Sequence, residues 1–482
     1  MGALLVALFS FVYWYTLAPT VLWGDSAKLC LYVHDMYLAA DPIGNHMLHT
    51  LFGKLFSFLP VGDFAYRQNL MSAFFGVLTL WVFYRMMRQM VDAPSAFLSA
   101  LSLGISHTFW LVSVVNESYA LLMFFFVLGF FLLLRWEKSG RNSYLYLHSF
   151  LIGAGLLSNM LEGMMVPATV LFLAASEKGR AWLFSRRFLW GVGCFFFSLF
   201  PMALLVLVQG PISIGGVGWF LRPGEIFPEI FFYPFYLFYQ FPLFGVWLGL
   251  MGLQQMFREK RDFLWVLSAV LFLDVLFASG YMRQRRFFLF LPSYFCFSVW
   301  IGFGTARVRT AWHRRTEVRT AALAALLVCM PIGLYLSVPF VAEKYHLDLV
   351  RGRKLALRDN NRFYLNPVKR NETGARDYGR KALEVTRPGS IIIGDFTPAM
   401  VLLYYQKTEG LRPDVEVTIF IDSYVRSPER RRELYAFIGA ELQRRPLYIA
   451  DNEESYYGIK ELKKQFDLIP QGPLWEIRHR ES

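Results

Sequence analysis

Side chains that could do chemistry gather directly after the first apolar run of the sequence. Asp25 follows the run 3–22 and a Trp23-Gly24 pair, and Lys28 comes about one helical turn later. A carboxylate in this position would be held at the boundary between lipid and water, where it could accept a proton as a general base or bind a metal ion. The competing interpretation is a solvated loop that carries charges because it lies outside the bilayer.

A second carboxylate, Glu117, lies in the short polar turn 115–119 between two apolar runs. We expect it near the outer surface, below the loop that carries Asp25. Glu162 lies in a similar turn, 158–163. Either of these carboxylates could simply mark a hydrated turn, although ionisable groups at membrane depth are more often functional than those in soluble loops.

Three arginines, Arg283, Arg285 and Arg286, lie together in the turn 281–286. This turn is expected on the outer side of the membrane, where basic residues are scarce. Guanidinium groups bind phosphate through paired hydrogen bonds, so the cluster indicates an anionic partner such as the phosphate of a lipid-linked substrate. Contact with lipid headgroups is the competing interpretation.

The histidines and cysteines do not predict a metal centre. His34, His46 and His49 follow Asp25 closely, but no consistent ligand spacing joins them to a carboxylate, and we interpret them as loop and surface residues. The 4 cysteines are far apart in the sequence, which predicts neither a disulfide framework nor a metal cluster. A divalent cation at the acidic residues stays an open alternative.

The composition indicates which elements must position these groups. Of the 482 residues, 55% are hydrophobic and 18% aromatic, and the mean hydropathy of +0.37 is unlike that of soluble domains. Long apolar runs predict a mainly α, polytopic membrane protein with about eleven transmembrane helices. These are expected at 3–22, 67–86, 94–114, 118–135, 144–158, 163–176, 188–208, 230–257, 263–280, 287–304 and 320–339. The first run lacks a basic start and a cleavage site, so we interpret it as a retained helix.

Basic residues in the connecting loops predict the orientation of the chain. Arginines and lysines concentrate in the loops on the same side as residue 1, for example in 178–187 and 307–319, and are fewer in the alternate loops. The positive-inside rule then places the N-terminus in the cytoplasm. An odd number of crossings puts the loop of Asp25 and the C-terminal part on the extracytoplasmic side. We therefore expect a multi-pass protein of a bacterial inner or plasma membrane.

The first outer loop, 23–66, belongs to a membrane domain that is expected to span 1–340. Apolar residues recur at helical spacing from Leu29 to Tyr37 and from Leu48 to Phe58. Both segments are too short to cross a membrane and are polar on one side. They predict two helices that lie along the membrane surface.

Beyond about residue 341 the sequence becomes charged and polar, which predicts a soluble domain over 341–482. Strand-like runs alternate there with helical patterns, as in an α/β domain with a mostly parallel sheet. The expected strands are 390–394, 415–421, 446–450 and 474–477. Asp395 and Asp451 follow two of them, at the carboxyl ends where such sheets place ligands. Because no Gly-rich phosphate loop accompanies them, they predict binding or docking more than catalysis.

Seven short segments near both ends and in the middle of the chain carry a common pattern. They are 18–26 (APTVLWGDS), 41–44 (DPIG), 67–73 (RQNLMSA), 116–120 (NESYA), 155–159 (GLLSN), 394–398 (GDFTP) and 410–415 (GLRPDV). The pattern resembles a family of polytopic proteins that includes the transmembrane protein O-mannosyltransferases and belongs to the GT-C class of glycosyltransferases. The resemblance implies an essential acid in the first extracytoplasmic loop, a polyprenyl-phosphate sugar donor and often a C-terminal soluble domain on the same side.

The resemblance also implies roles for single residues. Asp25 would be the catalytic base and Glu117 its helper, because the acceptor must lose a proton. Cationic and polar side chains would hold the donor and stabilise its leaving phosphate. The candidate substrate-binding residues are Lys28, Asp41, Arg67, Asn69, Asn159, Arg222, Arg283, Arg285 and Arg286.

The implied function is transfer of a sugar from a polyprenyl-phosphate donor to an extracytoplasmic acceptor, either a protein hydroxyl, a glycan or a lipid. Departures from the family pattern at Lys28, Asp41 and Met160 leave the metal dependence and the sugar open. A transporter or flippase of lipid-linked sugars is one alternative, but it should show an internal repeat, and the sequence shows none. A non-catalytic membrane scaffold is the other. Partners other than nucleic acid are expected: the lipid bilayer, the donor and the acceptor.

Overall fold

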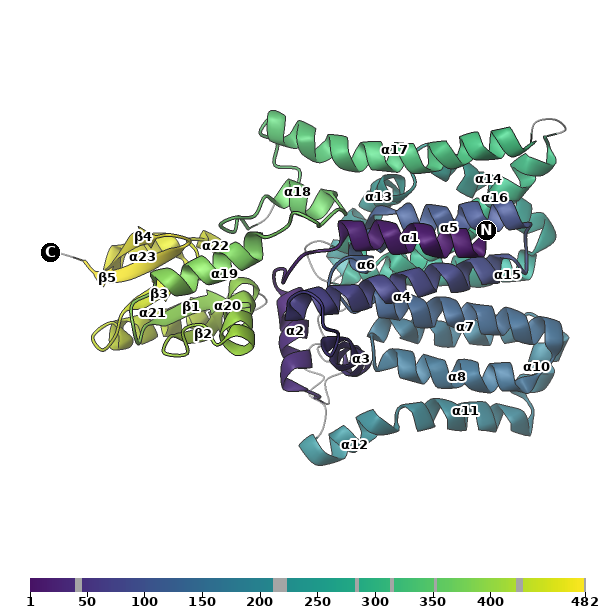
Figure 1. Ribbon diagram of the computed structural model, residues 1–482. Coiled ribbons are helices and arrows are strands. Elements are labelled where there is room, and N and C mark those ends of the chain that lie inside the picture. Colours follow the sequence, from purple (N-terminus) through teal and green to yellow (C-terminus); the bar gives the residue numbers. More distant parts are fainter. Residues whose placement is uncertain are drawn as a thin grey trace.

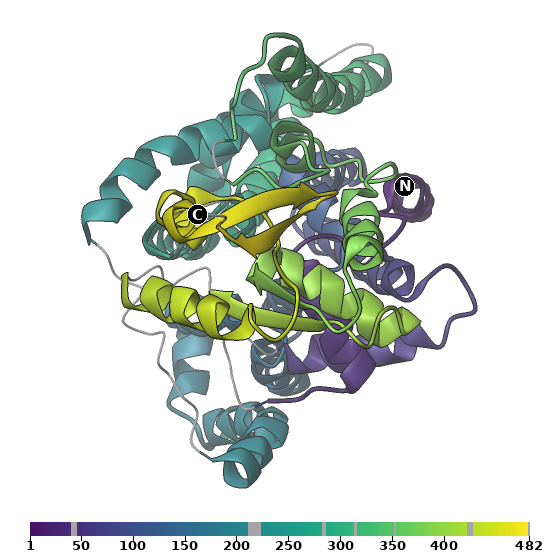
Figure 2. The ribbon, with the colours of Figure 1, turned by 90° about the vertical axis from the view of Figure 1, so that its left-hand side faces the viewer.

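The computed structural model describes residues 1–39, 46–210, 223–281, 286–312, 316–350, 353–421 and 428–480. A bundle of apolar helices makes up most of it, and a small α/β domain packs against one end of the bundle (Figure 1). Figure 2, seen from the side of that domain, shows the domain in front of the bundle. The helices of the bundle are α1 (Gly2–Thr16), α4 (Phe64–Met87), α5 (Ala93–Ile105), α6 (His107–Ser113), α7 (Tyr119–Ser139), α8 (Asn142–Leu156), η1 (Met160–Met164), α9 (Met165–Ala174), α10 (Glu177–Leu183), α11 (Arg186–Ser198), α12 (Phe200–Gln209), α13 (Pro223–Gln240), α14 (Phe244–Glu259), α15 (Arg261–Gly280), η3 (Arg286–Phe288), α16 (Leu291–Thr310) and α17 (Thr316–Lys344).

Each predicted span coincides with a helix or with a bent pair of helices. In the described ranges, 4 helices are long and apolar enough to cross a membrane: α4, α7, α15 and α17. Four pairs would each add one span, bent by 70° between α5 and α6, 119° between α9 and α10, 48° between α11 and α12, and 109° between α13 and α14. The described chain therefore has 4 such spans, or up to 8. The predicted helical membrane fold is confirmed, and the number of eleven crossings stays a prediction.

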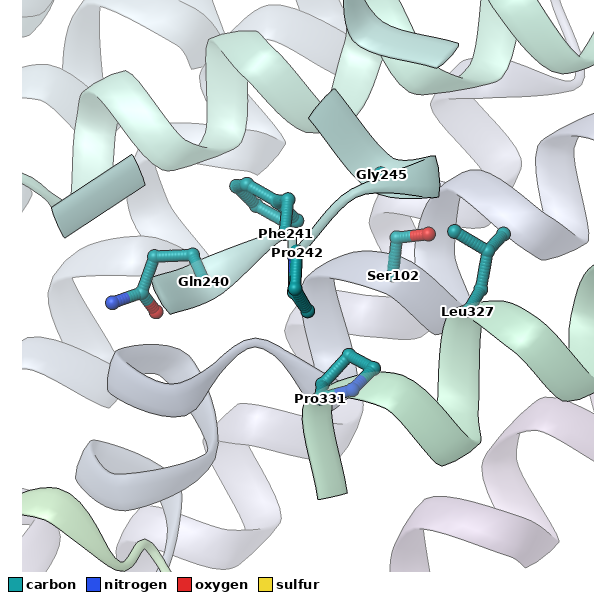
Figure 3. A pocket seen from close by; sticks show the side chains of 7 residues that line it. All are labelled: Ser102, Gln240, Phe241, Pro242, Gly245, Leu327 and Pro331. Atoms are coloured by element: carbon teal, nitrogen blue, oxygen red, sulfur yellow. The ribbon is translucent and has the colours of Figure 1, made fainter. Parts of the chain in front are cut away.

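Pro242 breaks the run 230–257, which the sequence pattern predicts as one continuous helix. Proline has no backbone N–H and pushes the preceding residue out of the helical region, so α13 ends at Gln240 and α14 begins at Phe244. Figure 3 shows this turn beside a small pocket that side chains of α5 and α17 also line. The side-chain oxygen of Gln240 accepts a hydrogen bond from the backbone N–H of Thr108 (2.8 Å). This N–H lies at the start of α6, next to the bend between α5 and α6, and has no partner within its own helix.

Two short helices of the first loop, α2 (Asp25–Asp35) and α3 (Met47–Ser57), lie at the end of the bundle. Figure 1 shows α2 running crosswise to the bundle helices, on the side of the α/β domain. Both helices occur where the amphipathic spacing predicts them. The packing is close, because a Cβ added to Gly53 of α3 would lie 2.5 Å from Val33 of α2 and 2.6 Å from Gln68 of α4. Helices α2 and α3 of the first loop are therefore packed against each other and against α4.

The C-terminal domain has a five-stranded sheet in the order β2-β1-β3-β5-β4. Its strands are β1 (Ile391–Asp395), β2 (Glu416–Ile421), β3 (Leu447–Ile449), β4 (Phe466–Gln471) and β5 (Leu474–His479), and its helices are α18 (Asn360–Leu365), α19 (Gly374–Val385), α20 (Phe396–Glu409), α21 (Pro428–Glu441), α22 (Glu454–Tyr457) and α23 (Ile459–Gln465). Strand β1 pairs in parallel with β2 and β3, whereas β5 pairs antiparallel with β3 and β4. The prediction of a mostly parallel sheet is wrong for β5, because a tight turn at Gly472 (φ +61°) folds it into a hairpin with β4, which was not among the predicted strands.

Candidate functional site

Asp25 is placed by the connection between α1 and α2. The buried side chain of Asn69 in α4 donates hydrogen bonds to the carbonyls of Ala18 (2.9 Å) and Thr20 (3.2 Å), which hold this connection against the bundle. Gly24 then turns the chain with φ +64° and ψ −118°, a conformation that residues with a Cβ rarely adopt. Helix α2 starts at Asp25, and the carboxylate is exposed at the end of the bundle.

Glu117 reaches the same place from the turn between α6 and α7. The side chain of the preceding residue, Asn116, donates to the carbonyl of Ser26 (3.1 Å), which ties this turn to the first turn of α2. Burial and the nearby carboxylate of Asp25 raise the pKa of Glu117 well above its ordinary value, and the ammonium of Lys28 partly lowers it. The two predicted catalytic residues and Lys28 thus lie together in the folded chain.

The charges at this site are open to an incoming molecule. Within the part of the chain that the structure describes, the carboxylates of Asp25 and Glu117 have no ion-pair or hydrogen-bond partner. The ammonium of Lys28 lies 5.2 Å from the ring centroid of Tyr32 and 5.8 Å from that of Phe396. The carboxylate of Asp25 can accept the proton of a hydroxyl, and the ammonium of Lys28 can attract a phosphate.

Three of the predicted substrate-binding residues support the framework of the site. Asn159 donates to the hydroxyl of Ser118 (3.0 Å) and accepts from the first turn of η1, so it holds the turn that carries Glu117. Arg67 donates to three backbone carbonyls between residues 57 and 62, at 2.8 to 3.3 Å. Because their donors and those of Asn69 bind the protein itself, we assign these residues to the framework and not to the substrate.

Other predicted substrate-binding residues lie outside the described residues. They are Asp41, Arg222, Arg283 and Arg285, together with the side chain of Arg286. Their assignment to the substrate stays a prediction.

The three histidines of the first loop differ in their surroundings. His34 is exposed, as predicted, and it pairs with Asp35 (2.8 Å). His46 donates to the carbonyl of Ser158 (2.5 Å), whereas His49 is fully buried in α3, and burial together with His46 lowers its pKa to about 3. The surface prediction is therefore wrong for His49, because α3 packs this face against its neighbours. Among the described residues, no group of three or more His, Cys, Asp or Glu side chains is arranged to hold a metal ion.

Asp395 and Asp451, which were predicted to meet a ligand at the edge of the sheet, meet another residue of the same chain. The guanidinium of Arg353, in the linker between α17 and α18, forms ion pairs with both carboxylates, and at most 7% of any of the three side chains is exposed. The same guanidinium lies 4.4 Å from the ring centroid of Tyr456. We call these three charged residues the Arg353 clamp. Arg353 occupies both carboxylates at this edge of the sheet, so the predicted docking role of the two aspartates is wrong.

Sequence reasoning missed three residues that shape the site: Asn116, Arg353 and Phe396. Two of them lie in segments of the common pattern, NESYA and GDFTP, and this was the available signal. Arg353 lies in no such segment, and a basic residue in a linker does not reveal its partners.

Comparison with known proteins relates this geometry to a class of enzymes. Residues 42–205 match the dolichyl-phosphate-mannose-protein mannosyltransferase family. The structure of ArnT from Cupriavidus metallidurans in the apo state is similar with a TM-score of 0.61 and 15% identity, over 98% of this chain and 97% of that one. For the same protein bound to undecaprenyl phosphate, the TM-score is 0.60 and the sequence identity is 13%, over the same shares of both chains. For the oligosaccharyltransferase of Archaeoglobus fulgidus tethered with an acceptor peptide, the TM-score is 0.52 and the sequence identity is 13%, over 100% of this chain and 74% of that one.

These similarities confirm the resemblance to the GT-C membrane glycosyltransferases and show that the chain has their fold. They agree with the apolar helices in describing a multi-pass membrane protein. At 13% to 15% identity they describe the fold alone, and the chemistry must be argued from the site.

Proposed function

We propose that the protein is an integral-membrane glycosyltransferase that moves a sugar from a polyprenyl-phosphate donor to an extracytoplasmic acceptor. The observation that carries the proposal is the meeting of Asp25, Lys28 and Glu117 at one end of a GT-C bundle. The undecaprenyl phosphate in the ArnT structure supports a lipid-phosphate donor, and the acceptor peptide of the oligosaccharyltransferase supports a peptide acceptor. A glycan and a lipid stay open as acceptors.

In the proposed reaction, Asp25 accepts the proton of the acceptor hydroxyl while the hydroxyl oxygen bonds to the anomeric carbon of the sugar. The bond from that carbon to the phosphate oxygen breaks, and its electron pair leaves with the polyprenyl phosphate. Attack from the face opposite the phosphate inverts the anomeric carbon. Lys28 stabilises the charge on the leaving phosphate, and the arginines of the turn 281–286 are further candidates for this role.

Glutamine in place of Glu117 should remove a fall in activity that we expect in the wild type as the pH rises through the raised pKa of Glu117. Because its pKa is raised, the carboxyl of Glu117 stays neutral over a wider range of pH. As the pH rises through this raised pKa, a second negative charge appears beside Asp25 and repels the donor phosphate. Glutamine is neutral throughout, so the profile of kcat/KM against pH should lose this fall.

Glu117→Asp serves as the control for this profile, because it keeps a titrating carboxyl and should keep the fall. A Glu117→Gln protein whose activity falls at the same pH as that of the wild type would assign the fall to another group.

We further propose that the N-terminus is cytoplasmic and that the site faces the extracytoplasmic side. Helix α1 runs toward the end that bears the α/β domain, so Asp25 and this domain share one side (Figure 1). The loop charges favour the extracytoplasmic side for both. We expect Lys463→Cys, at an exposed position of α23, to react with a membrane-impermeant maleimide in intact cells, after Cys194 and Cys329 have been replaced by serine.

Lys260→Cys, in the exposed turn between α14 and α15, is the matched control and should react only after lysis. The reverse pattern, with Lys463→Cys protected in intact cells, would contradict the proposed orientation.

The test of the function is mass spectrometry of glycoproteins, glycans and lipids from cells with and without the gene, followed by transfer from a polyprenyl-phosphate sugar with the purified protein. We expect one class of acceptor to lose a sugar in the deletion and to regain it with the wild-type gene. Unchanged spectra in all three classes would count against a glycosyltransferase and favour a scaffold.

A further inference from the structure

The GDFTP segment, residues 394–398, places an aromatic side chain of the C-terminal domain at the rim of the site. Strand β1 ends at Asp395, and α20 starts at Phe396. A Cβ added to Gly24 would lie 3.7 Å from Phe396 Cε1 and 3.8 Å from Thr397 Cγ2. The first turn of α20 therefore packs on the glycine turn that leads into α2.

Phe396 also faces the cation of the site. Its ring centroid lies 5.8 Å from the ammonium of Lys28, and the ring of Tyr32 lies at 5.2 Å from the same atom. A cation over an aromatic face is attracted by the ring, more strongly where water is partly excluded. Since no carboxylate of the described chain pairs directly with Lys28, the two rings hold this ammonium while it acts electrostatically on Glu117.

The Arg353 clamp fixes the position of Phe396. One oxygen of Asp395 accepts from the backbone N–H of Thr397 (3.0 Å) and caps α20, and the other oxygen pairs with Arg353. This carboxylate is fully buried, so water does not compete for either contact. The linker, the end of β1 and the start of α20 are thereby joined into one support for the ring.

We propose that Phe396 is a positioning residue of the active site, through which the C-terminal domain orients Lys28 toward the donor phosphate. The inference rests on the proposed function, because it takes the phosphate as the ligand of Lys28. A lysine side chain loses rotamer freedom when it binds a ligand, and a ring that restricts it beforehand reduces this loss. The soluble domain then contributes to donor binding even though its own sheet edge is closed.

Binding of undecaprenyl phosphate to the purified full-length protein in detergent tests this inference. Phe396→Leu keeps an apolar side chain without an aromatic face, and Lys28→Gln removes the ammonium. We expect Phe396→Leu to raise the Kd roughly 2- to 30-fold, the range of one cation–π contact. The double variant should bind no more weakly than Lys28→Gln alone, because the ring acts through the ammonium. Phe396→Tyr, which keeps a ring, should bind like the wild type.

Tyr404→Phe is the matched control, since it removes a different contact between the same domain and the membrane domain, the hydrogen bond from Ala65 N at the start of α4 to the Tyr404 hydroxyl (3.2 Å). It should leave the Kd unchanged. The inference is overturned if Phe396→Leu binds like the wild type or if Tyr404→Phe raises the Kd as much as Phe396→Leu does. It is also overturned if the increases in Kd of the two single variants multiply in the double variant. A wild type that binds the lipid phosphate but transfers no sugar would refute only the proposed function, and one that does not bind it would refute both.

Discussion

Asparagine in place of Asp25 should lower the rate of sugar transfer roughly 10²- to 10⁴-fold, the loss typical of removing a general base. Asparagine has the size of aspartate but cannot accept the proton of the acceptor. The Asp25 side chain is exposed, so the exchange should leave expression and thermal stability near wild type. The measurement is the initial rate with the purified protein at saturating donor, where the loss should fall on kcat.

Asp63→Asn is the control for Asp25→Asn, because Asp63 belongs to the same loop and has structural contacts instead. Its carboxylate accepts hydrogen bonds from the hydroxyl of Thr20 (2.6 Å) and from Tyr66 N (2.6 Å) at the start of α4. This variant should change stability more than the rate. A purified Asp25→Asn protein that transfers sugar at the wild-type rate would remove the catalytic role of Asp25 and favour Asp41 or a scaffold.

Methionine in place of Arg353 should destabilise the C-terminal domain by about 3–5 kcal/mol, the cost of leaving a buried charge without its partner. Both partners of Arg353 are carboxylates, and the exposed fractions are 0% for Asp395 and 7% for Asp451. Removing the guanidinium therefore leaves two like charges in a site with little access to water. Limited proteolysis and thermal unfolding of the full-length protein in detergent should show the loss.

Two further variants make this result specific. Adding Asp395→Asn and Asp451→Asn to Arg353→Met should recover much of the stability, because the amides are neutral and their oxygens can still accept from Thr397 N (3.0 Å) and Glu453 N (2.9 Å). Arg380→Met removes an exposed ion pair to Glu409 (2.7 Å) and should cost less than about 1 kcal/mol. Equal losses in Arg353→Met and Arg380→Met would show that the clamp contributes no more than a surface ion pair.

The order of the amino acids was sufficient to predict the helical membrane fold and the places of most elements. Helices α4 and α7 and strands β1 and β2 begin and end within a few residues of their predicted bounds. The position of Asp25 at the start of a short helix after a glycine turn was also predictable. These features depend on the length and period of apolar runs and on turn residues, which are properties of one segment at a time.

Only the tertiary structure decided which polar groups meet. Asn69 and Arg67 look like ligands of a substrate in the sequence, but in the folded chain they donate to backbone carbonyls that need partners. Likewise, Asp395 and Asp451 lie where sheets bind ligands, yet Arg353 occupies the place. A pattern shows that a side chain is polar, but its partner depends on packing between distant segments. The sequence predicted Glu117 below the loop that carries Asp25, and in the folded chain the packing of α2 against the turn at Asn116 brings the two side chains together.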